Sequence, residues 1–210
     1  SQAWVTGSGT SILNRTGAIS GAGGMQKTGT GSLGLSGNNA FTGGFMLGNG
    51  TANTSETATA TSGSGGFVIV GHNNALGAGV VQVRGAQLQA GVAGIALSNT
   101  TTFNLDGGGL RFGGSNDLTL NGNLAIVNGS PRDIANYTGA RTLTLNGNLA
   151  NAGQNVTVIG KAAAPNGTTI FNGVISGGGQ FILQPTFPGG TVVLGGANTY
   201  TGNTVVNTGL

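Results

Sequence analysis

The chain has 210 residues, of which 45 are glycine and only 5% are charged, and its net charge is +3. Seven basic residues, scattered without a cluster, exclude a phosphate-binding face, so we expect no nucleic-acid partner. No apolar run approaches the roughly 18 residues needed to span a bilayer, so we expect no membrane insertion by this segment. The absence of cysteine excludes disulfides and thiolate metal sites.

Short apolar runs separated by Gly, Asn, Thr and Ser make up most of the chain. Because 37% of residues are hydrophobic and few are charged, this is not the composition of a disordered protein. Such runs, joined by residues that accept tight turns, predict many short strands and no long helix. The expected fold class is therefore all-β.

Two segments before Phe67 differ from the rest of the chain. Residues 1–17 hold the only tryptophan, Trp4, which we expect to cover the core of a terminal repeat as a cap; the alternative is an ordinary, partly buried side chain. Residues 51–66, TANTSETATATSGSGG, have no large apolar side chain to offset the entropy of ordering. We expect them to protrude as a loop.

From Phe67 onward, strands follow one another at short intervals. In AQLQA, residues 86–90, polar and apolar residues alternate, which turns one face inward and the other outward. DLTLNGNLA, which begins at Asp117, recurs almost unchanged as TLTLNGNLA from Thr142. A repeat of this length is typical of a solenoid, in which each coil rests on the previous one.

The whole of residues 1–210 is therefore predicted to form one elongated domain, a single-stranded parallel β-helix (β-solenoid) with about 25 residues per coil. Inward leucines are expected to stack on their counterparts one coil away, namely Leu118, Leu120 and Leu124 on Leu143, Leu145 and Leu149. Side-chain amide ladders are expected at the corners, from Asn121 and Asn123 to Asn146 and Asn148.

A longer repeat links the two ends of the chain. LSGNNAFTGG, which begins at Leu35, matches LGGANTYTGN, which begins at Leu194. The ending GGANTYTGNTVVNTGL and its diverged counterpart SGNNAFTGGFMLGNG resemble the autotransporter-associated β-strand repeat, found in passenger regions of very large bacterial secreted proteins. The resemblance covers most of residues 18–210. It implies a right-handed parallel β-helix of a type V secreted protein, located outside the bacterial cell.

Candidate catalytic and metal-binding side chains are few. The chain has one histidine, His72, and four acidic residues, Glu56, Asp106, Asp117 and Asp133. A glycosidase or lyase on this scaffold needs clustered carboxylates or a carboxylate-bound calcium ion. The repeat period does not gather all four acids, although Asp106 and Asp117 could approach each other in neighbouring coils. We assign no catalytic, cofactor-binding or metal-binding residue, and no cofactor.

The sequence favours a non-enzymatic structural role on a bacterial surface or in secreted form, as stalk, adhesin scaffold or extracellular fibre. Ser1 in place of an initiator Met predicts a processed form or an excerpt of a longer polypeptide. Expected partners are the rest of a larger passenger chain and a host or matrix glycan or protein. A first alternative is a filament subunit that associates end to end, since an uncapped coil offers unpaired strand edges.

Two further alternatives stay open. One is a carbohydrate-active enzyme, against which the scarcity of acids argues. The other is an ice-binding solenoid, which needs a flat array of outward threonines. Thr119 and Thr144 in the two repeated strands allow such an array, but two rows of one residue do not make one.

Overall fold

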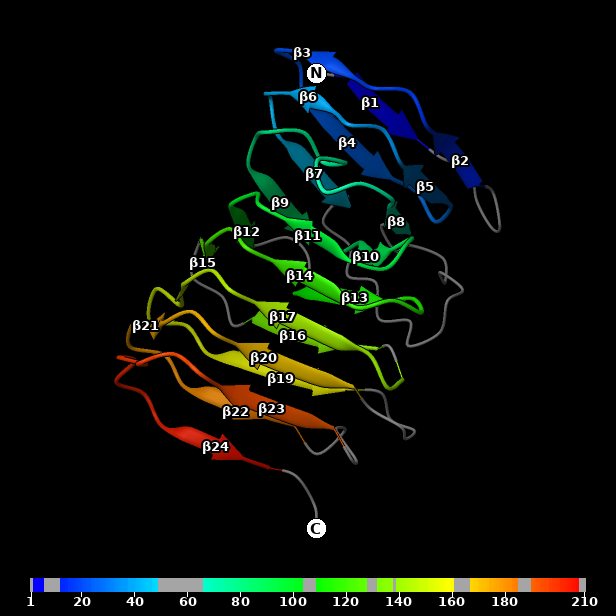
Figure 1. Ribbon diagram of the computed structural model, residues 1–210. Helices are drawn as coiled ribbons and strands as arrows, with labels where there is room; N and C mark the ends of the chain where they lie inside the picture. Colours follow the sequence, from blue (N-terminus) through cyan, green and yellow to red (C-terminus); the bar gives the residue numbers. More distant parts are fainter. Residues whose placement is uncertain are drawn as a thin grey trace.

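The chain folds as an elongated parallel β-solenoid (Figure 1). The computed structural model describes residues 2–5, 12–48, 66–103, 109–127, 132–137, 139–160, 167–184 and 190–207. Within these ranges the chain forms 24 short strands and no helix, and hydrogen-bonded strands run parallel. The predicted fold class is therefore confirmed.

Two long sheets and two shorter ones form the sides of the coils. The first sheet has eight strands, in the order β1 (Gln2–Val5), β4 (Met25–Thr28), β7 (Phe45–Gly48), β9 (Val81–Arg84), β12 (Thr101–Phe103), β15 (Leu124–Ile126), β18 (Leu149–Ala150) and β21 (Ile175–Ser176). The second has nine, in the order β2 (Ile12–Arg15), β5 (Ser32–Leu35), β8 (Phe67–Val70), β10 (Gln87–Ala90), β13 (Leu110–Gly113), β16 (Arg132–Asn136), β19 (Val156–Gly160), β22 (Phe181–Leu183) and β24 (Thr204–Val206).

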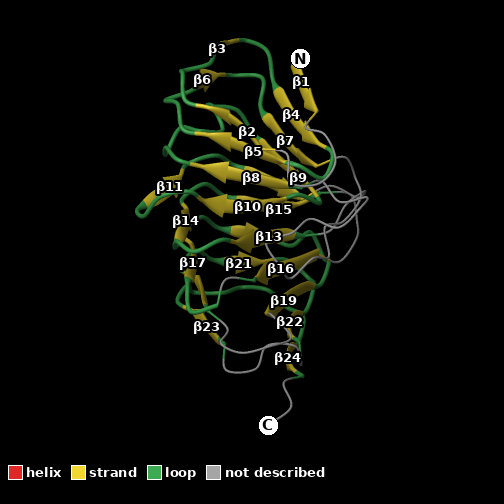
Figure 2. Cartoon of the chain, turned by 90° about the vertical axis from the view of Figure 1, so that its right-hand side faces the viewer, coloured by secondary structure: helices red, strands yellow, loops and turns green. Residues whose placement is uncertain are grey.

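The third side of the solenoid is divided between the two shorter sheets. The upper one pairs β3 (Ser20–Gly21) with β6 (Ala40–Phe41). The lower one has five strands, in the order β11 (Ile95–Leu97), β14 (Leu118–Leu120), β17 (Thr142–Leu145), β20 (Thr168–Phe171) and β23 (Thr191–Leu194). Figure 2 shows β3 and β6 above β11, β14, β17 and β23 on the same side of the molecule.

The spacing between paired strands is close to the predicted period. Leu118 pairs with Leu143, and Leu110 pairs with Ile134, so that each strand meets the equivalent strand of the next coil. The interval is longest at the step from β7 to β9, where Phe45 pairs with Val81, because residues 49–65 lie between β7 and β8. Outside that coil the intervals range from 20 residues, between Met25 and Phe45, to 26 residues, between Leu149 and Ile175, so this step is the largest departure from the period.

Inward side chains form one continuous apolar core along the solenoid. Its buried members extend from Met25 in β4 to Phe181 in β22. The predicted leucine stack is confirmed, because all six of its members are buried and in register: Leu118, Leu120, Leu124, Leu143, Leu145 and Leu149. This core is the main source of stability, since backbone ladders alone contribute little net free energy.

Lys27 is a charged exception within this core. It occupies an inward position of β4 and is fully buried, and its ammonium group donates to the carbonyl oxygens of Thr28 and Gly29, both at 2.7 Å. Burial lowers the pKa of Lys27 from 10.5 to about 8, because a charged amine loses hydration inside the protein.

One corner carries a ladder of asparagine amides. Asn146 Nδ2 donates to Asn121 Oδ1, and Asn172 Nδ2 donates to Asn146 Oδ1, each at 2.8 Å. The predicted ladder is confirmed for this column and extends one coil further. For Asn123 and Asn148 the prediction was wrong, because their Oδ1 atoms accept from backbone N–H groups of the next coil at 3.0 and 2.9 Å. The backbone is the nearer donor where the chain turns inward toward the next strand.

Two predictions on the N-terminal third fall largely outside the described residues. Within residues 1–17, β1 and β2 pair with β4 and β5 as part of the two long sheets. The side chain of Trp4 and residues 51–65 of the expected loop lie outside the part of the chain that the structure describes.

Candidate functional site

The third side of the solenoid is interrupted between β6 and β11. Residues 71–80, which connect β8 to β9, form no strand and turn instead, with the Ala75 N–H donating to His72 O and the Gly77 N–H to Asn74 O, both at 3.0 Å. Ala75 and Leu76 are buried and anchor this turn in the core. Gly77 has a φ of 69°, a conformation that glycine accepts without strain.

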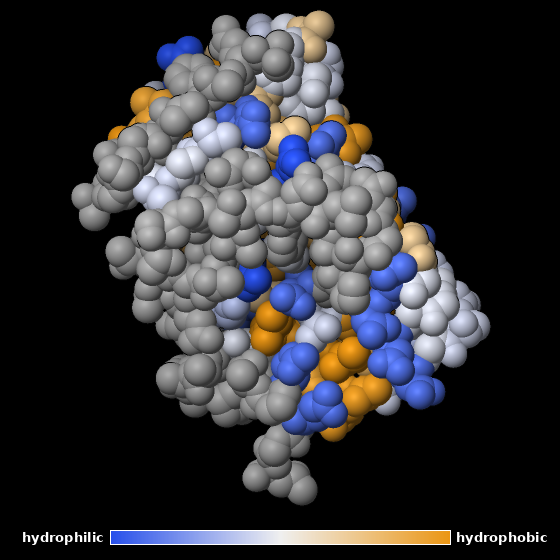
Figure 3. Space-filling view, turned by 180° about the vertical axis from the view of Figure 1, so that it is seen from behind, coloured by the Kyte–Doolittle hydropathy of each residue, from blue (hydrophilic) through white to orange (hydrophobic). Residues whose placement is uncertain are grey.

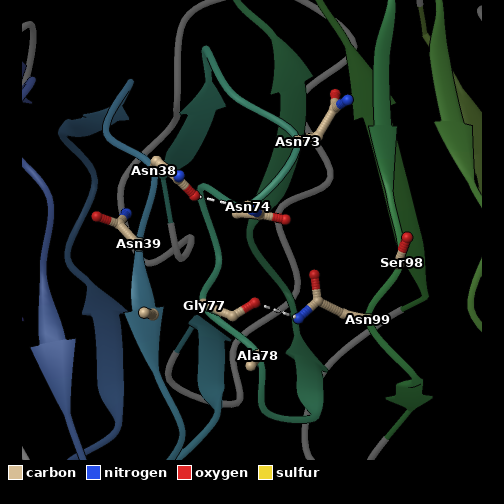
Figure 4. Close-up of a pocket in the computed structure, with 9 residues that line it drawn as sticks. Asn38, Asn39, Asn73, Asn74, Gly77, Ala78, Ser98 and Asn99 are labelled. Carbon is tan, nitrogen blue, oxygen red and sulfur yellow. Dashed lines mark hydrogen bonds between the residues drawn. The ribbon is translucent and has the colours of Figure 1, made fainter.

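This interruption opens a pocket of about 390 Å³ on the outside of the solenoid (Figure 4). Its polar lining comes from three successive coils: Asn38, Asn39, Asn73, Asn74, Ser98 and Asn99. Asn38 and Asn39 precede β6, the next two asparagines belong to the turn, and Ser98 and Asn99 lie between β11 and β12. No charged side chain is among the described residues that line it.

Two of these asparagines fix the walls of the pocket. Asn39 is buried; its Oδ1 accepts from the Ile19 N–H at 2.8 Å and its Nδ2 donates to Ala75 O at 2.7 Å. Asn99 Nδ2 donates to Gly77 O at 3.0 Å and to Gly79 O at 2.8 Å. Asn39 thereby joins Ile19, directly before β3, to the turn, and Asn99 joins the following coil to it, so the turn is held against its neighbouring coils.

The remaining asparagines form the rim. Asn74 Nδ2 donates to Asn38 Oδ1 at 2.8 Å, and these two side chains point toward one another in Figure 4. Asn73 Oδ1 accepts from the Ala96 N–H at 2.9 Å. Each rim side chain thus uses one amide group for structure. Its second group makes no hydrogen bond within the part of the chain that the structure describes, and neither does the exposed Ser98 hydroxyl.

The titratable residues considered from the sequence do not converge here. His72 is a turn residue whose Nδ1 accepts from the Asn74 N–H at 3.0 Å, and Asp117 Oδ1 accepts from the Thr142 N–H at 2.8 Å. Glu56 and Asp106, including the suggested approach of Asp106 to Asp117, lie outside the described residues. Among the residues described, no three acidic or histidine side chains gather within reach of a metal ion.

Asp133 belongs instead to a polar cluster on the nine-stranded sheet. Its carboxylate lies 3.8 Å from the guanidinium of Arg111, which is only 4% exposed. Arg111 also donates to the Tyr137 hydroxyl at 2.7 Å and lies 5.7 Å from the centre of that ring. Arg111 therefore has an ion-pair, a hydrogen-bond and a cation–π partner, and the cluster is a structural one.

Outward threonines are more numerous than the sequence repeat suggested. Thr119 pairs with Thr144, as expected, and this column continues with the apolar Ile170 and Val193. A second column on the same sheet consists entirely of threonine: Thr142, Thr168 and Thr191. The two columns place five threonines on one side of the five-stranded sheet.

The fold defines the class of this protein: it is a parallel β-solenoid. No model of a known protein family, no curated protein and no solved structure matches the chain. No helix in its described part has the length and apolarity needed to cross a membrane.

Proposed function

We propose that the chain is a non-enzymatic structural β-solenoid of a secreted or surface-located bacterial protein, in which it acts as a stalk or adhesin scaffold. The observation that carries the proposal is the unbroken pairing of β1 through β21 and of β2 through β24. Eight strands stacked at about 4.8 Å extend the solenoid by about 34 Å along its axis. The resemblance of most of residues 18–210 to the autotransporter repeat supports the location outside the cell.

Side-chain contacts between coils support the role of a rigid spacer. The amide ladder from Asn121 to Asn172 ties three coils together at one corner. Across the core, Phe171 in β20 and Phe181 in β22 meet edge to face within one turn, with ring centres 5.4 Å apart, and Tyr200 of the last coil follows at 6.2 Å from Phe181. Contacts of this kind resist bending, because a bend would separate the stacked groups on one side of the solenoid.

A second candidate function is end-to-end assembly into a filament. Leu194 and Val206 occupy inward positions of the last coil and are 37% and 62% exposed, whereas Phe171, the partner of Leu194 one coil earlier, is 2% exposed. At the opposite end, Leu13 is 37% exposed above the fully buried Leu33. A further coil would cover these side chains: in a filament it comes from a second copy, and in a stalk from a longer chain.

The last coil has free strand edges as well as exposed apolar side chains. Figure 3, which views the solenoid from the side, shows hydrophobic atoms among hydrophilic ones on the lower part of that lateral face. Stacking a coil on the last one would also pair the free edges of β23 and β24, since neither has a strand beyond it in the described part.

Electron microscopy and sedimentation of the protein isolated from its source distinguish the two candidates. Discrete rods containing a solenoid of about 34 Å are expected for the stalk. Continuous filaments with an axial repeat of that order would support the filament subunit instead, and compact round particles would contradict both. Antibody labelling of intact source cells tests the location, because a signal that requires lysis would contradict a surface role.

A further inference from the structure

We propose that the asparagine-lined pocket binds a neutral saccharide, as one or two hexose units of a glycan. Its volume of about 390 Å³ lies within the range of known ligand pockets, which begins at about 300 Å³. The pocket is formed where the third side of the solenoid is interrupted between β6 and β11, and its polar residues come from three coils. This inference goes beyond the scaffold role and does not depend on it.

The uncommitted groups of the pocket are a mixed set of donors and acceptors. Asn38 and Asn73 each retain an Nδ2 donor, because their Oδ1 atoms are the ones in use. Asn74 and Asn99 each retain an Oδ1 acceptor, because their Nδ2 groups are in use. Ser98 adds a hydroxyl, which both donates and accepts. Sugar hydroxyls likewise donate and accept, so adjacent hydroxyls on one ring match such a set.

The uncharged, polar lining disfavours anionic, cationic and apolar ligands. An anionic ligand is held by arginine or lysine, and a cationic ligand by a carboxylate or an aromatic face. None of these is among the described lining residues. An apolar ligand would strip water from the amide groups without replacing its hydrogen bonds. A neutral ligand rich in hydroxyl groups is the class that remains.

The pocket is organised before a ligand arrives. Asn39 and Asn99 fix its walls through four hydrogen bonds to backbone groups. The Asn38 and Asn74 side chains hold each other, and Asn73 is held by the Ala96 N–H. Binding therefore costs little side-chain entropy. Without an aromatic platform the affinity of a single site is expected in the millimolar range, which repeated sites on a larger surface protein would raise through multivalency.

The test is a titration followed by nuclear magnetic resonance on the chain of 20.3 kDa, observing the side-chain NH₂ groups of asparagine. The probes are maltose, lactose and N,N′-diacetylchitobiose as neutral saccharides, and sialyllactose as an anionic one. We expect saturable shifts for Asn38, Asn73 and Asn74 with at least one neutral probe. Shifts with sialyllactose alone, or no shift of these amides with any probe at millimolar concentrations, would overturn the proposal.

Two variants and one matched control assign the binding to the pocket. Asn73→Asp keeps the acceptor for the Ala96 N–H but removes the Nδ2 donor, and Ser98→Ala removes an exposed hydroxyl. Each is expected to weaken binding about 3- to 10-fold. Asn155→Asp is the control, because Asn155 Oδ1 accepts from the Gln180 N–H at 3.0 Å in the same manner and Asn155 does not line the pocket.

The comparison between these variants decides the outcome. Binding that is weakened by Asn73→Asp and Ser98→Ala but not by Asn155→Asp supports the pocket, and equal effects of all three would overturn it. If Asn73→Asp fails to fold, Ser98→Ala carries the test, since its hydroxyl makes no hydrogen bond to another described residue. The appearance of the molecule in the electron microscope is independent of all these results, so failure of the saccharide site is distinguishable from failure of the scaffold role.

Discussion

Replacing Gly147 by alanine is expected to destabilise the solenoid severely. Gly147 lies between Asn146 and Asn148 at the ladder corner, and its backbone passes directly over Gly122 of the previous coil. A Cβ atom on Gly147 would lie 2.0 Å from the Gly122 carbonyl oxygen, whereas ordinary contact begins at 3.4 Å. The two backbones would therefore have to separate by about 1.4 Å, which is 3.4 minus 2.0.

The magnitude follows from the hydrogen bonds on either side of that contact. The Asn146 N–H donates to Leu120 O at 2.8 Å, and the Asn148 N–H donates to Asn123 Oδ1 at 3.0 Å. A separation of that size would lengthen both beyond the range of a hydrogen bond. Both bonds lie at an exposed corner, so each contributes about 0.5–1.5 kcal/mol, and losing both costs about 1–3 kcal/mol in the free energy of unfolding.

Gly23→Ala is the matched control for this substitution. A Cβ atom on Gly23 would meet nothing within 4 Å, and the φ angle of Gly23 is not in the positive region. This variant is therefore expected to be neutral, or more stable by about 0.5 kcal/mol, because alanine lowers the conformational entropy of the unfolded chain. Equilibrium unfolding in urea measures the free energy of unfolding of both variants. Stabilities of the two variants within about 1 kcal/mol of each other would refute the argument that stacked glycines are required by the close approach of coils.

Three other predictions concern Lys27, the amide ladder and the repeat architecture. The pKa of Lys27 is 10.5 in the unfolded chain and about 8 in the folded one, so between these pH values the unfolded chain binds more protons. The free energy of unfolding should therefore rise with pH across this window, by at most about 3 kcal/mol. Urea unfolding between these pH values should show the rise, and its persistence in Lys27→Met would contradict the assignment. Asn146→Ala removes two ladder bonds and should cost about 1–2 kcal/mol in thermal or urea unfolding; an unchanged midpoint would show that the ladder adds nothing to stability. Stretching single molecules by their ends should release coils of about 24 residues in steps of about 80 Å, whereas one step for the whole chain would contradict coil-by-coil stability.

The regular part of the solenoid could be predicted because its contacts join equivalent positions of neighbouring repeats. Leu118 packs on Leu143 and Asn121 bonds Asn146, and both pairs are separated by the same interval as the visible repeat. In a solenoid the sequence period is also the contact period. The alternation in residues 86–90 predicted burial less well, because the polar Gln87 is only 2% exposed. The Oε1 atom of Gln87 accepts a hydrogen bond from Gln89 Nε2 at 3.0 Å.

The features that the sequence did not reveal depend on unequal coil lengths. Thr142, Thr168 and Thr191 are aligned in register although their spacings along the chain differ, so no single period connects them. Their alignment strengthens the case for the ice-binding alternative over what Thr119 and Thr144 offered alone, and a thermal hysteresis measurement tests it. The burial of Lys27 and Arg111 was hidden for another reason, because each long side chain hydrogen-bonds to groups that no repeat specifies.

The pocket and the ladder show why a binding site is expected at an irregular coil and not within the regular array. In the regular part, Asn146 uses both groups of its amide, one for the coil before and one for the coil after. At the interruption, Asn73 has a neighbour for its Oδ1 but none for its Nδ2 among the described residues. An asparagine corner leaves hydrogen-bonding capacity for a ligand only where the adjacent coil departs from the repeat. Segments that turn where the neighbouring coils form a strand, as residues 71–80 do, are therefore where a solenoid of this composition can acquire specificity without adding charged or aromatic residues.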